Sequence, residues 1–332
     1  MITRRDFLKL SGLGLAASIL PPIPPDEAPR TMLGRAIRQI EIYDRPSLSA
    51  KTVSSIWGET VFDIYDTVLS DDEHYNRTWY AVRRGYVYSG RVQPVQWKLQ
   101  KPSLEKVKGG YLGEISVPYT SAKSWPHPRS ETRNRFYYGQ THWITDARRD
   151  EFGTVWYEVA DDRFQMWSWV KGEHLRRVTA EELAPIAPKA EKRIEVSLAE
   201  QTFQCFEDGV QVLDVLCSTG PYLRTENGQR VYGTPSGDHA ITRKRASRHM
   251  AGDDLASDDF YDLPGVPWVS YFHWWGVSIH GTYWHNDYGR PRSHGCINLP
   301  PETAKWVYRW TLPQPFVDKQ AVEGKGTAVI VF

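Results

Sequence analysis

The sequence predicts a mainly β protein made of several small units. Aromatic residues make up 13% of the 332 residues, with 14 Trp and 18 Tyr, and Gly and Pro are interspersed among them. This composition favours β structure over helix bundles. Short runs of alternating apolar and polar residues, separated by turn residues, are typical of strands. Only residues 301–310 have a convincing helical pattern, with Pro301 and Glu302 in the first turn.

The charge balance excludes one broad class of function. The chain has 41 Lys and Arg against 40 Asp and Glu, which gives a formal charge of +1. A nucleic-acid-binding protein should have a clear basic excess, so we expect no nucleic-acid partner. The chain is 40% hydrophobic and 24% charged, as is ordinary for globular proteins.

The N-terminal residues, 1–34, predict an export signal followed by a Pro-rich linker. Arg4 and Arg5 precede the apolar stretch Leu10–Leu20, which is 11 residues long. A membrane-spanning helix needs roughly 20 apolar residues, so this stretch is typical of a signal peptide. The segment Thr3–Lys9 resembles the twin-arginine export signal. The alternative is a basic N-terminus before a short core helix.

The resemblance to the twin-arginine signal implies a location and a partner. It implies export in the folded state by the twin-arginine machinery, to the periplasm or the cell wall of a prokaryote. Whether the signal is cleaved or stays as an anchor is left open.

Residues 35–97 predict a first β unit. Four short apolar runs, separated by turn residues, have the pattern of a small β-barrel or sandwich. The runs are Ile40–Ile42, Val61–Tyr65, Trp79–Val82 and Tyr86–Tyr88.

Residues 112–180 are predicted to be a second copy of this unit. Trp156–Val159 repeats the pattern of Trp79–Val82, and Ser168–Val170 is placed like Tyr86–Tyr88. The pair resembles tandem bacterial SH3-like domains, which would imply binding to the cell wall or to a partner protein. Generic β structure with aromatic cores is the alternative.

A charged, Pro-containing segment, Ala180–Arg193, is a predicted linker to a third unit over residues 193–332. This unit begins with alternating runs that predict a hairpin around Gly209. Between Gly237 and Tyr271 lies a long connection, residues 238–270. Long loops are often lids, and a solvated charged surface loop is the equal alternative.

The chain has three cysteines, so at least one has no partner within the chain. Cys205 and Cys217 lie at unequal distances from the predicted turn at Gly209, so a disulfide between them is doubtful. Both lie in apolar alternating runs, which favours buried, inert thiols.

The third cysteine has a different setting. Cys296 lies in a polar, Gly-containing loop, with His280 and His294 as candidate bases. A thiol titrates near 8.5, and a nearby His, backbone N–H groups or a helix N-terminus can lower that value. Gly295 allows an unusual backbone turn before the sulfur, and amides at Gly295 and Cys296 suit a developing oxyanion. We expect the helix near Pro301 to direct its positive end toward this loop.

These residues match a known motif. The run Ser293–Asn298, with His280-Gly281-Thr282 upstream, resembles the catalytic motif of the L,D-transpeptidase (YkuD) family. The resemblance covers roughly residues 193–332. It implies a YkuD-type β-sandwich with a short helix after the nucleophile, preceded by the two SH3-like barrels.

The resemblance also implies roles. Cys296 would be the nucleophile and His280 the general base, oriented by the carbonyl of Gly281. The implied catalytic set is Cys296, His280, Gly281, Ser293, His294 and Gly295. His294 has a structural alternative, which is packing beside the sulfur. The candidate substrate-binding residues are Asn298, Arg290, Arg292, Tyr283 and Trp284.

The implied reaction is acyl transfer in peptidoglycan. Cys296 would attack the carbonyl of the third-position diamino acid of a tetrapeptide stem, D-Ala would leave, and an amine of a second stem would resolve the thioester as a 3→3 cross-link. Water as the acceptor would make the protein a carboxypeptidase. No metal and no other cofactor is implied, and the partners are donor and acceptor stems.

Three rival classes of protein fit this sequence less well. An NlpC/P60-type peptidase places its catalytic His after the Cys, and no His follows His294 here. A zinc hydrolase would use histidines that lack a helical metal-binding spacing, namely His273, His280, His285 and His294. A non-catalytic wall-binding protein would not need the motif residues that this sequence retains.

Overall fold

The computed structural model describes residues 32–221, 233–252 and 261–332. Short strands dominate these ranges, and their only α-helix is α2 (Pro301–Trp310). The predicted mainly β fold and the helix over 301–310 are therefore confirmed. The predicted twin-arginine signal and most of the Pro-rich linker lie outside the described residues. Within the described ranges, we find no helix with the length and apolar character needed to cross a membrane.

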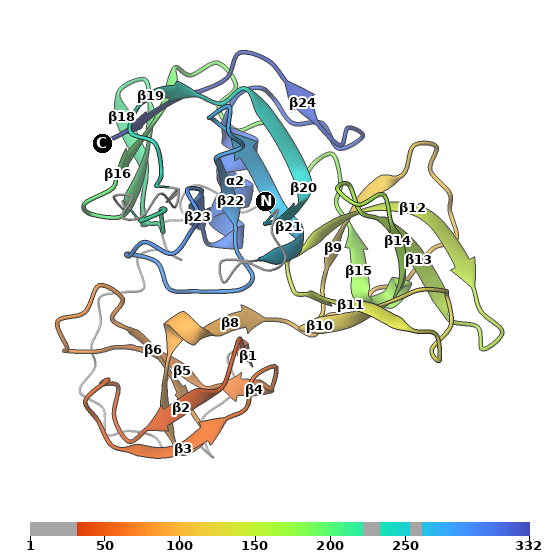
Figure 1. Ribbon diagram of the computed structural model, residues 1–332, viewed down its shortest axis with the longest axis horizontal. Helices are drawn as coiled ribbons and strands as arrows, with labels where there is room; N and C mark the ends of the chain where they lie inside the picture. The colour runs from red at the N-terminus through yellow and green to blue at the C-terminus, as the bar shows by residue number, and fades with distance from the viewer. Residues whose placement is uncertain (1–31, 222–232, 253–260) are drawn as a thin grey trace, which may run out of the picture.

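The first unit, red to orange in Figure 1, contains two sheets, of strand order β4-β1-β8 and β3-β2-β7-β6-β5. The four alternating runs of the sequence become β2, β4, β6 and β7, with residues such as Val82 and Val87 buried between the sheets. The elements are β1 (Met32–Ala36), β2 (Ile40–Tyr43), β3 (Thr52–Ile56), β4 (Val61–Ile64), β5 (Asp66–Leu69), β6 (Thr78–Val82), β7 (Gly85–Tyr88), the 3-10 turn η1 (Ser89–Arg91) and β8 (Val92–Val95).

The second unit repeats the order of the first. A tryptophan-containing hairpin, a 3-10 turn and a strand follow one another as β6, β7, η1 and β8 and again as β13, β14, η2 and β15. Its sheet has the order β11-β10-β14-β13-β12-β9-β15. The SH3-like interpretation of both units stays a prediction. The elements are β9 (Tyr111–Ile115), β10 (Tyr119–Lys123), β11 (Thr132–Tyr137), β12 (Thr141–Arg149), β13 (Val155–Ala160), β14 (Trp167–Lys171), η2 (Gly172–His174) and β15 (Leu175–Arg177).

The third unit has two five-stranded sheets, β18-β17-β16-β25-β19 and β23-β22-β21-β20-β24. Side chains from both sheets and from α2, among them Phe203, Ile279 and Val307, form one buried cluster. The strands are β16 (Lys192–Ser197), β17 (Thr202–Glu207), β18 (Val210–Leu216), β19 (Gly237–Ala240), β20 (Arg243–Ala251), β21 (Asp262–Tyr271), β22 (Ser278–Gly281), β23 (Ile297–Leu299), β24 (Val322–Glu323) and β25 (Ala328–Val331).

The prediction of a long irregular connection over residues 238–270 is wrong. Its described residues form β19 and the hairpin of β20 and β21, and only 253–260 lie outside the described ranges. The alternation of β20 is not visible in the sequence because Lys244, a residue type that is usually exposed, occupies a buried position of this strand. The lid hypothesis therefore loses the long loop on which it depended.

Lys244 is buried because it completes the end of α2. Its Nζ donates hydrogen bonds to the carbonyl oxygens of Tyr308, Thr311 and Pro313 at 2.7, 2.6 and 2.8 Å. The last carbonyls of a helix have no partner within the helix, and they attract a cation. This lysine thus ties β20 to the helix that packs behind β21 and β22.

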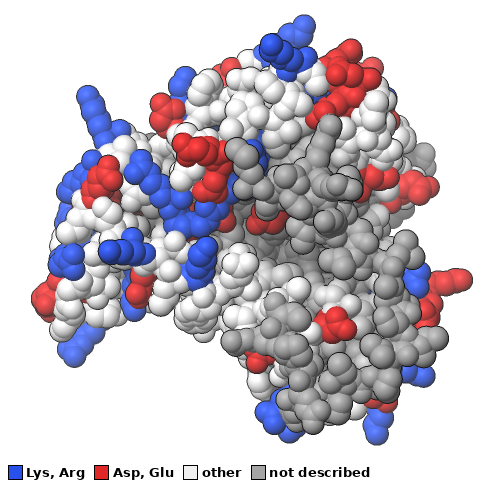
Figure 2. Space-filling model, turned by 180° about the vertical axis from the view of Figure 1, so that it is seen from behind, with Lys and Arg blue, Asp and Glu red and all other residues white. Residues whose placement is uncertain are grey.

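The three units contact one another through specific hydrogen bonds. Thr141 of β12 donates to the Ala246 carbonyl of β20 at 2.6 Å. Arg35 of β1, only 2% exposed, donates to the Tyr283 carbonyl of the third unit at 2.9 Å. Figure 1 shows the first two units on different sides of the third. Basic and acidic side chains are interspersed on the face seen in Figure 2, consistent with the balanced charge.

Candidate active site

Cys296 and His280 are brought together by two parallel strands. β22 pairs with β23 so that Ile279 faces Ile297 and His280 faces Asn298. Paired residues of adjacent strands place their side chains on one face, and so do residues two apart on the same strand. Cys296 directly precedes β23, one step before Ile297, and is therefore level with Ser278. The Cys296 Sγ indeed lies 3.6 Å from the Ser278 Oγ.

His280 is held in one orientation and one tautomer. Its Nδ1 lies 3.0 Å from the carbonyl oxygen of Gly281. A carbonyl only accepts hydrogen bonds, so Nδ1 carries the proton and Nε2 keeps its lone pair. Burial lowers the pKa of His280 to about 4, although the Gly281 carbonyl acts in the opposite direction. The imidazole is therefore neutral at pH 7 and able to accept a proton.

The Cys296 side chain is half-buried, unlike those of the other two cysteines. Burial raises the pKa of its thiol, and the hydrogen bonds of Ser278 oppose this effect. At pH 7 the thiol and the imidazole are thus both neutral, and a thiolate would form only where a base takes the proton.

The other cysteines have the setting that was predicted for them. Cys205 and Cys217 are fully buried and unpaired. Burial raises the pKa of the Cys205 thiol and raises that of Cys217 to about 12. A buried, protonated thiol is unreactive, so only Cys296 has access to solvent.

The backbone before Cys296 is shaped by a glycine and two hydroxyl groups. Gly295 has φ of +112°, a conformation that side-chain-bearing residues rarely adopt. The Ser293 Oγ accepts from the Gly295 N–H at 3.1 Å and donates to the Cys296 carbonyl. Thr234 donates to the Gly295 carbonyl at 2.8 Å. Since the Gly295 amide is already engaged, the amides of Cys296 and His294 are the candidates for an oxyanion hole.

The N-terminus of α2 follows β23 closely in the chain. β23 separates Cys296 from α2, a length of about 10 Å for three residues of strand. The start of α2 instead abuts Gly281, where an added Cβ would lie 3.0 Å from the Pro301 Cα. The start of α2 is thus placed beside the end of β22, the strand that carries His280.

We call residues 281–296, which join the base to the nucleophile, the catalytic loop. Two of its predicted substrate-binding residues are paired with a neighbour. The Arg290 Nη2 lies 3.0 Å from the Asp287 carboxylate, and Arg292 forms an ion pair with the same carboxylate. Both guanidinium groups are thus engaged in the loop itself.

The remaining candidates differ in their exposure. Tyr283 is 3% exposed and donates its hydroxyl to the Pro264 carbonyl at 2.9 Å. Trp284 is half-buried, with its ring centroid 5.7 Å from that of His280. Asn298 is buried, and its side-chain amide lies 2.9 Å from the His285 Nε2. Of these three, only Trp284 combines partial exposure with contact to the base.

His294 has its ring contact with a residue outside the loop. Its side chain is exposed, and its ring lies 4.9 Å from that of Tyr261. The roles of His280 as the base and of His294 near the sulfur stay predictions.

Sequence reasoning missed three residues of this site. Ser278 was missed although it lies two residues before His280, a spacing that places both side chains on one face of a strand. Thr234 begins the run Thr-Pro-Ser-Gly, whose pattern indicates a turn and no contact with the site. Asp287 carried no motif signal, because its importance depends on residues more than 190 positions earlier in the chain.

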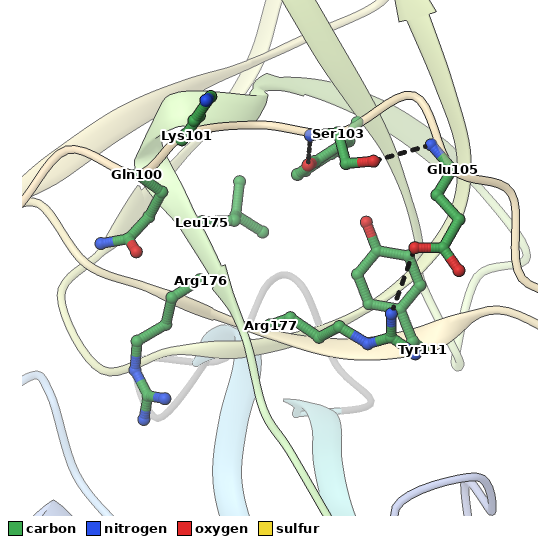
Figure 3. A pocket seen from close by; sticks show the side chains of 9 residues that line it. Gln100, Lys101, Ser103, Glu105, Tyr111, Leu175, Arg176 and Arg177 are labelled. Atoms are coloured by element: carbon green, nitrogen blue, oxygen red, sulfur yellow. Dashed lines mark hydrogen bonds and ion pairs between the residues drawn. The ribbon is translucent and has the colours of Figure 1, made fainter.

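No predicted site residue lines the pocket in Figure 3. This pocket, of about 140 Å³, lies on the second unit and is lined by Gln100, Tyr111, Arg177 and their neighbours. In residues 32–221, 233–252 and 261–332, no three His, Cys, Asp or Glu side chains are placed to hold a metal ion.

Comparison with known proteins agrees with the geometry. The sequence model of the YkuD family, described as the L,D-transpeptidase catalytic domain, matches residues 191–331. This segment is a YkuD domain. No curated protein matches the chain.

Solved structures to which this chain is similar include L,D-transpeptidases. A mutant Enterococcus faecium L,D-transpeptidase is 25% identical to this chain, with a TM-score of 0.32. The match covers 43% of this chain and 50% of that structure. The catalytic domain from E. faecium is 27% identical over 43% of this chain and 97% of its own, with a TM-score of 0.32. An L,D-transpeptidase from Mycobacterium smegmatis is 18% identical over 72% of this chain and 94% of its own, with a TM-score of 0.34.

The TM-scores, between 0.32 and 0.34, are below the level that shows a shared overall fold. The chain also spans only half of the longer E. faecium structure. The assignment therefore rests on the YkuD domain and applies to residues 191–331.

Proposed function

We propose that the protein is a peptidoglycan L,D-transpeptidase whose nucleophile is Cys296. The donor is a tetrapeptide stem, and the bond broken is the amide between its third-position diamino acid and D-Ala. The acceptor is the side-chain amine of a second stem, which gives a 3→3 cross-link.

In the first half-reaction, the His280 Nε2 takes the thiol proton as the sulfur attacks the amide carbonyl. The oxygen of the tetrahedral intermediate gains negative charge and receives hydrogen bonds from backbone amides near Cys296. The carbonyl then re-forms, the C–N bond breaks, and His280 gives its proton to the departing D-Ala amine. The product is a thioester on Cys296.

In the second half-reaction, His280 removes a proton from the acceptor amine as it attacks the thioester. The C–S bond breaks, the proton returns to the sulfur, and a new amide joins the two stems. A single arrangement of base and nucleophile thus serves both halves.

One observation carries the proposal. The tautomer fixed by Gly281 leaves the Nε2 lone pair of a neutral His280 on the same strand face as the half-buried Cys296 thiol. The YkuD match over residues 191–331 supports the substrate class.

Intact mass spectrometry after incubation with a purified disaccharide-tetrapeptide tests the first half-reaction. We expect loss of D-Ala from the stem and a transient adduct on Cys296, with neither seen for Cys296→Ala. An unchanged stem in the presence of folded protein would overturn the proposal.

Adding an acceptor stem identifies the second step. A cross-linked dimer supports transpeptidation, whereas a tripeptide alone identifies water as the acceptor and replaces the proposal by an L,D-carboxypeptidase.

We also propose that the chain acts outside the inner membrane, because its N-terminal residues resemble a twin-arginine signal. Changing both Arg4 and Arg5 to Lys should move the protein from the exported to the cytoplasmic fraction. Fractionation of cells that express this variant measures the change. Unchanged export would remove the twin-arginine machinery as a partner.

A further inference from the structure

The catalytic loop rests on the first unit of the chain. The Asn286 amide N–H donates to the Gly90 carbonyl at 3.3 Å, and its side chain donates to the Tyr80 hydroxyl at 3.3 Å. Arg35 donates to the Tyr283 carbonyl at 2.9 Å. In Figure 1 the loop that joins β22 to β23 lies on the side of the YkuD domain that faces β1–β8. The segment between base and nucleophile is thus contacted along its length by another unit.

Asp287 is the centre of this contact. Its carboxylate is 1% exposed and accepts hydrogen bonds from the Tyr75 hydroxyl at 2.9 and 3.0 Å and from the Tyr88 hydroxyl at 2.6 Å. On its other side it pairs with Arg290 and Arg292 of the loop. A buried carboxylate is unfavourable unless its lone pairs are satisfied, so two tyrosines of the first unit complete a site in the YkuD domain.

The charge state agrees with this role. Burial raises the pKa of Asp287, but hydrogen bonds from Tyr88 and Arg292 outweigh it, and the pKa lies below its ordinary value. The carboxylate is therefore ionised at neutral pH and binds the loop arginines firmly.

A short chain of contacts leads from Asp287 to the sulfur. Arg292, held by Asp287, is adjacent to Ser293. Ser293 in turn binds the Gly295 N–H and the Cys296 carbonyl through its hydroxyl. A shift of Asp287 would thus be passed on to the backbone that carries the nucleophile.

The two units fit closely at this point. Gly90 lies in η1 of the first unit, and a Cβ added there would lie 2.6 Å from the Asp287 Oδ1. Only glycine leaves room for the carboxylate at this position.

We propose that Asp287 is a positioning residue, and that Tyr75 and Tyr88 of the first unit hold the catalytic loop in its reactive form through it. The first unit is then a part of the active-site scaffold. The reaction that this serves is the proposed transpeptidation, but the geometry of Cys296 can be measured without that substrate.

The test compares the full chain with the double variant Tyr75→Phe plus Tyr88→Phe and with Asp287→Asn. The Phe changes remove two hydroxyl groups and keep the ring volume. Tyr43→Phe is the matched control, because the Tyr43 hydroxyl binds Glu41 within the first unit, at 2.7 Å, and not the loop. Folding is checked by circular dichroism and thermal unfolding.

Two readouts are measured for each folded variant. The first is the rate of Cys296 alkylation by iodoacetamide as a function of pH, located by peptide mass mapping. The second is kcat and KM with the tetrapeptide donor. We expect the double variant and Asp287→Asn to lower kcat about tenfold or more with little change in KM, and to change the alkylation profile, with Tyr43→Phe behaving as the parent.

The outcomes separate this inference from the proposed function. Failure of the parent protein to use the donor would overturn the proposed function, while the alkylation profiles would still test the positioning role. If both variants keep the parent's alkylation profile and, where the parent is active, its kcat, the first unit does not position the loop. If Asp287→Asn does not fold, the double variant alone decides whether the first unit positions the loop.

Discussion

At the scale of single residues, the site consists of two groups that are both uncharged at rest. His280 and Cys296 are placed where burial disfavours an imidazolium and a thiolate alike. The proposed mechanism therefore does not depend on a preformed ion pair. Its reactivity comes from the position of the Nε2 lone pair, which the Gly281 carbonyl fixes.

The pH dependence of Cys296 acylation follows from this arrangement. Since the pKa of His280 is lowered to about 4, the base is lost only as the pH falls through that value. We expect the acidic limb of kcat/KM near pH 4, well below the value of about 6.5 for an ordinary histidine. Rapid-quench acylation between pH 3.5 and 8 measures it, and a limb near 6.5 would contradict the neutral, buried base.

Substitution of Cys296 should affect activity, whereas substitution of Cys205 should affect stability. Cys296→Ala should abolish acyl transfer and leave the fold intact. Cys205→Ala should keep acyl transfer and lose about 1 kcal/mol of unfolding free energy, because it removes a buried sulfur from the core. Donor turnover and urea unfolding of both variants check this, and an inactive but folded Cys205→Ala would contradict it.

Gly295 should be sensitive to any side chain. With φ of +112°, Gly295→Ala adds about 1–3 kcal/mol of backbone strain next to the nucleophile, so we expect slower acylation. Gly209→Ala is the matched control, since Gly209 has φ of +82° at the hairpin turn of β17 and β18, with open space around it. It should lose similar stability and keep its activity. An equal loss of activity in both variants would contradict this, because it would show that backbone strain lowers activity wherever it lies in the domain.

At the scale of elements, helix α2 is fixed by a lysine from a strand. The α2 pattern was visible in the sequence, but the buried partner of its last carbonyls was not, because Lys244 lies more than 60 residues earlier. This contact also explains why β20 was missed, since a lysine at an inward position contradicts simple alternation.

Lys244→Met should destabilise the YkuD domain. The change leaves three buried carbonyl groups without a donor, at a cost of about 3 kcal/mol or more. Lys325→Met, at an exposed position, is the control and should have little effect. Urea unfolding compares the two variants. Equal unfolding midpoints would contradict the prediction and mean that water donates to the three carbonyl groups in place of the lysine.

At the scale of the whole molecule, the units are joined by buried polar groups on both sides of the YkuD domain. On one side Tyr75 and Tyr88 reach Asp287. On the other, His249 of β20 is bound by Asp161 of the second unit and by Asp262 of β21. We therefore expect the units to unfold together.

The His249 contact makes this coupling depend on pH. Burial lowers the pKa of His249, but Asp161 and Asp262 outweigh it, so the pKa is raised above its ordinary value. A raised pKa means that the stabilisation is complete below about pH 6.5 and is lost as the pH rises through the folded-state value. Thermal unfolding from pH 6 to 9 should show this loss in the parent and not in His249→Gln. His127→Gln, at a surface site of the second unit, should retain it.

The mainly β fold and the residues that we propose for catalysis could both be predicted from the sequence. The motif around Cys296 and His280 is local, and period-2 alternation and the pattern of residues 301–310 report burial along one segment. Only the tertiary structure decided what surrounds that chemistry. Lys244 and Asp287 acquire their roles from groups on other elements or another unit, and no local pattern encodes such contacts. The physical reason is that satisfying a buried charge or hydroxyl requires a partner in space, and the chain can supply that partner from any distance along its length.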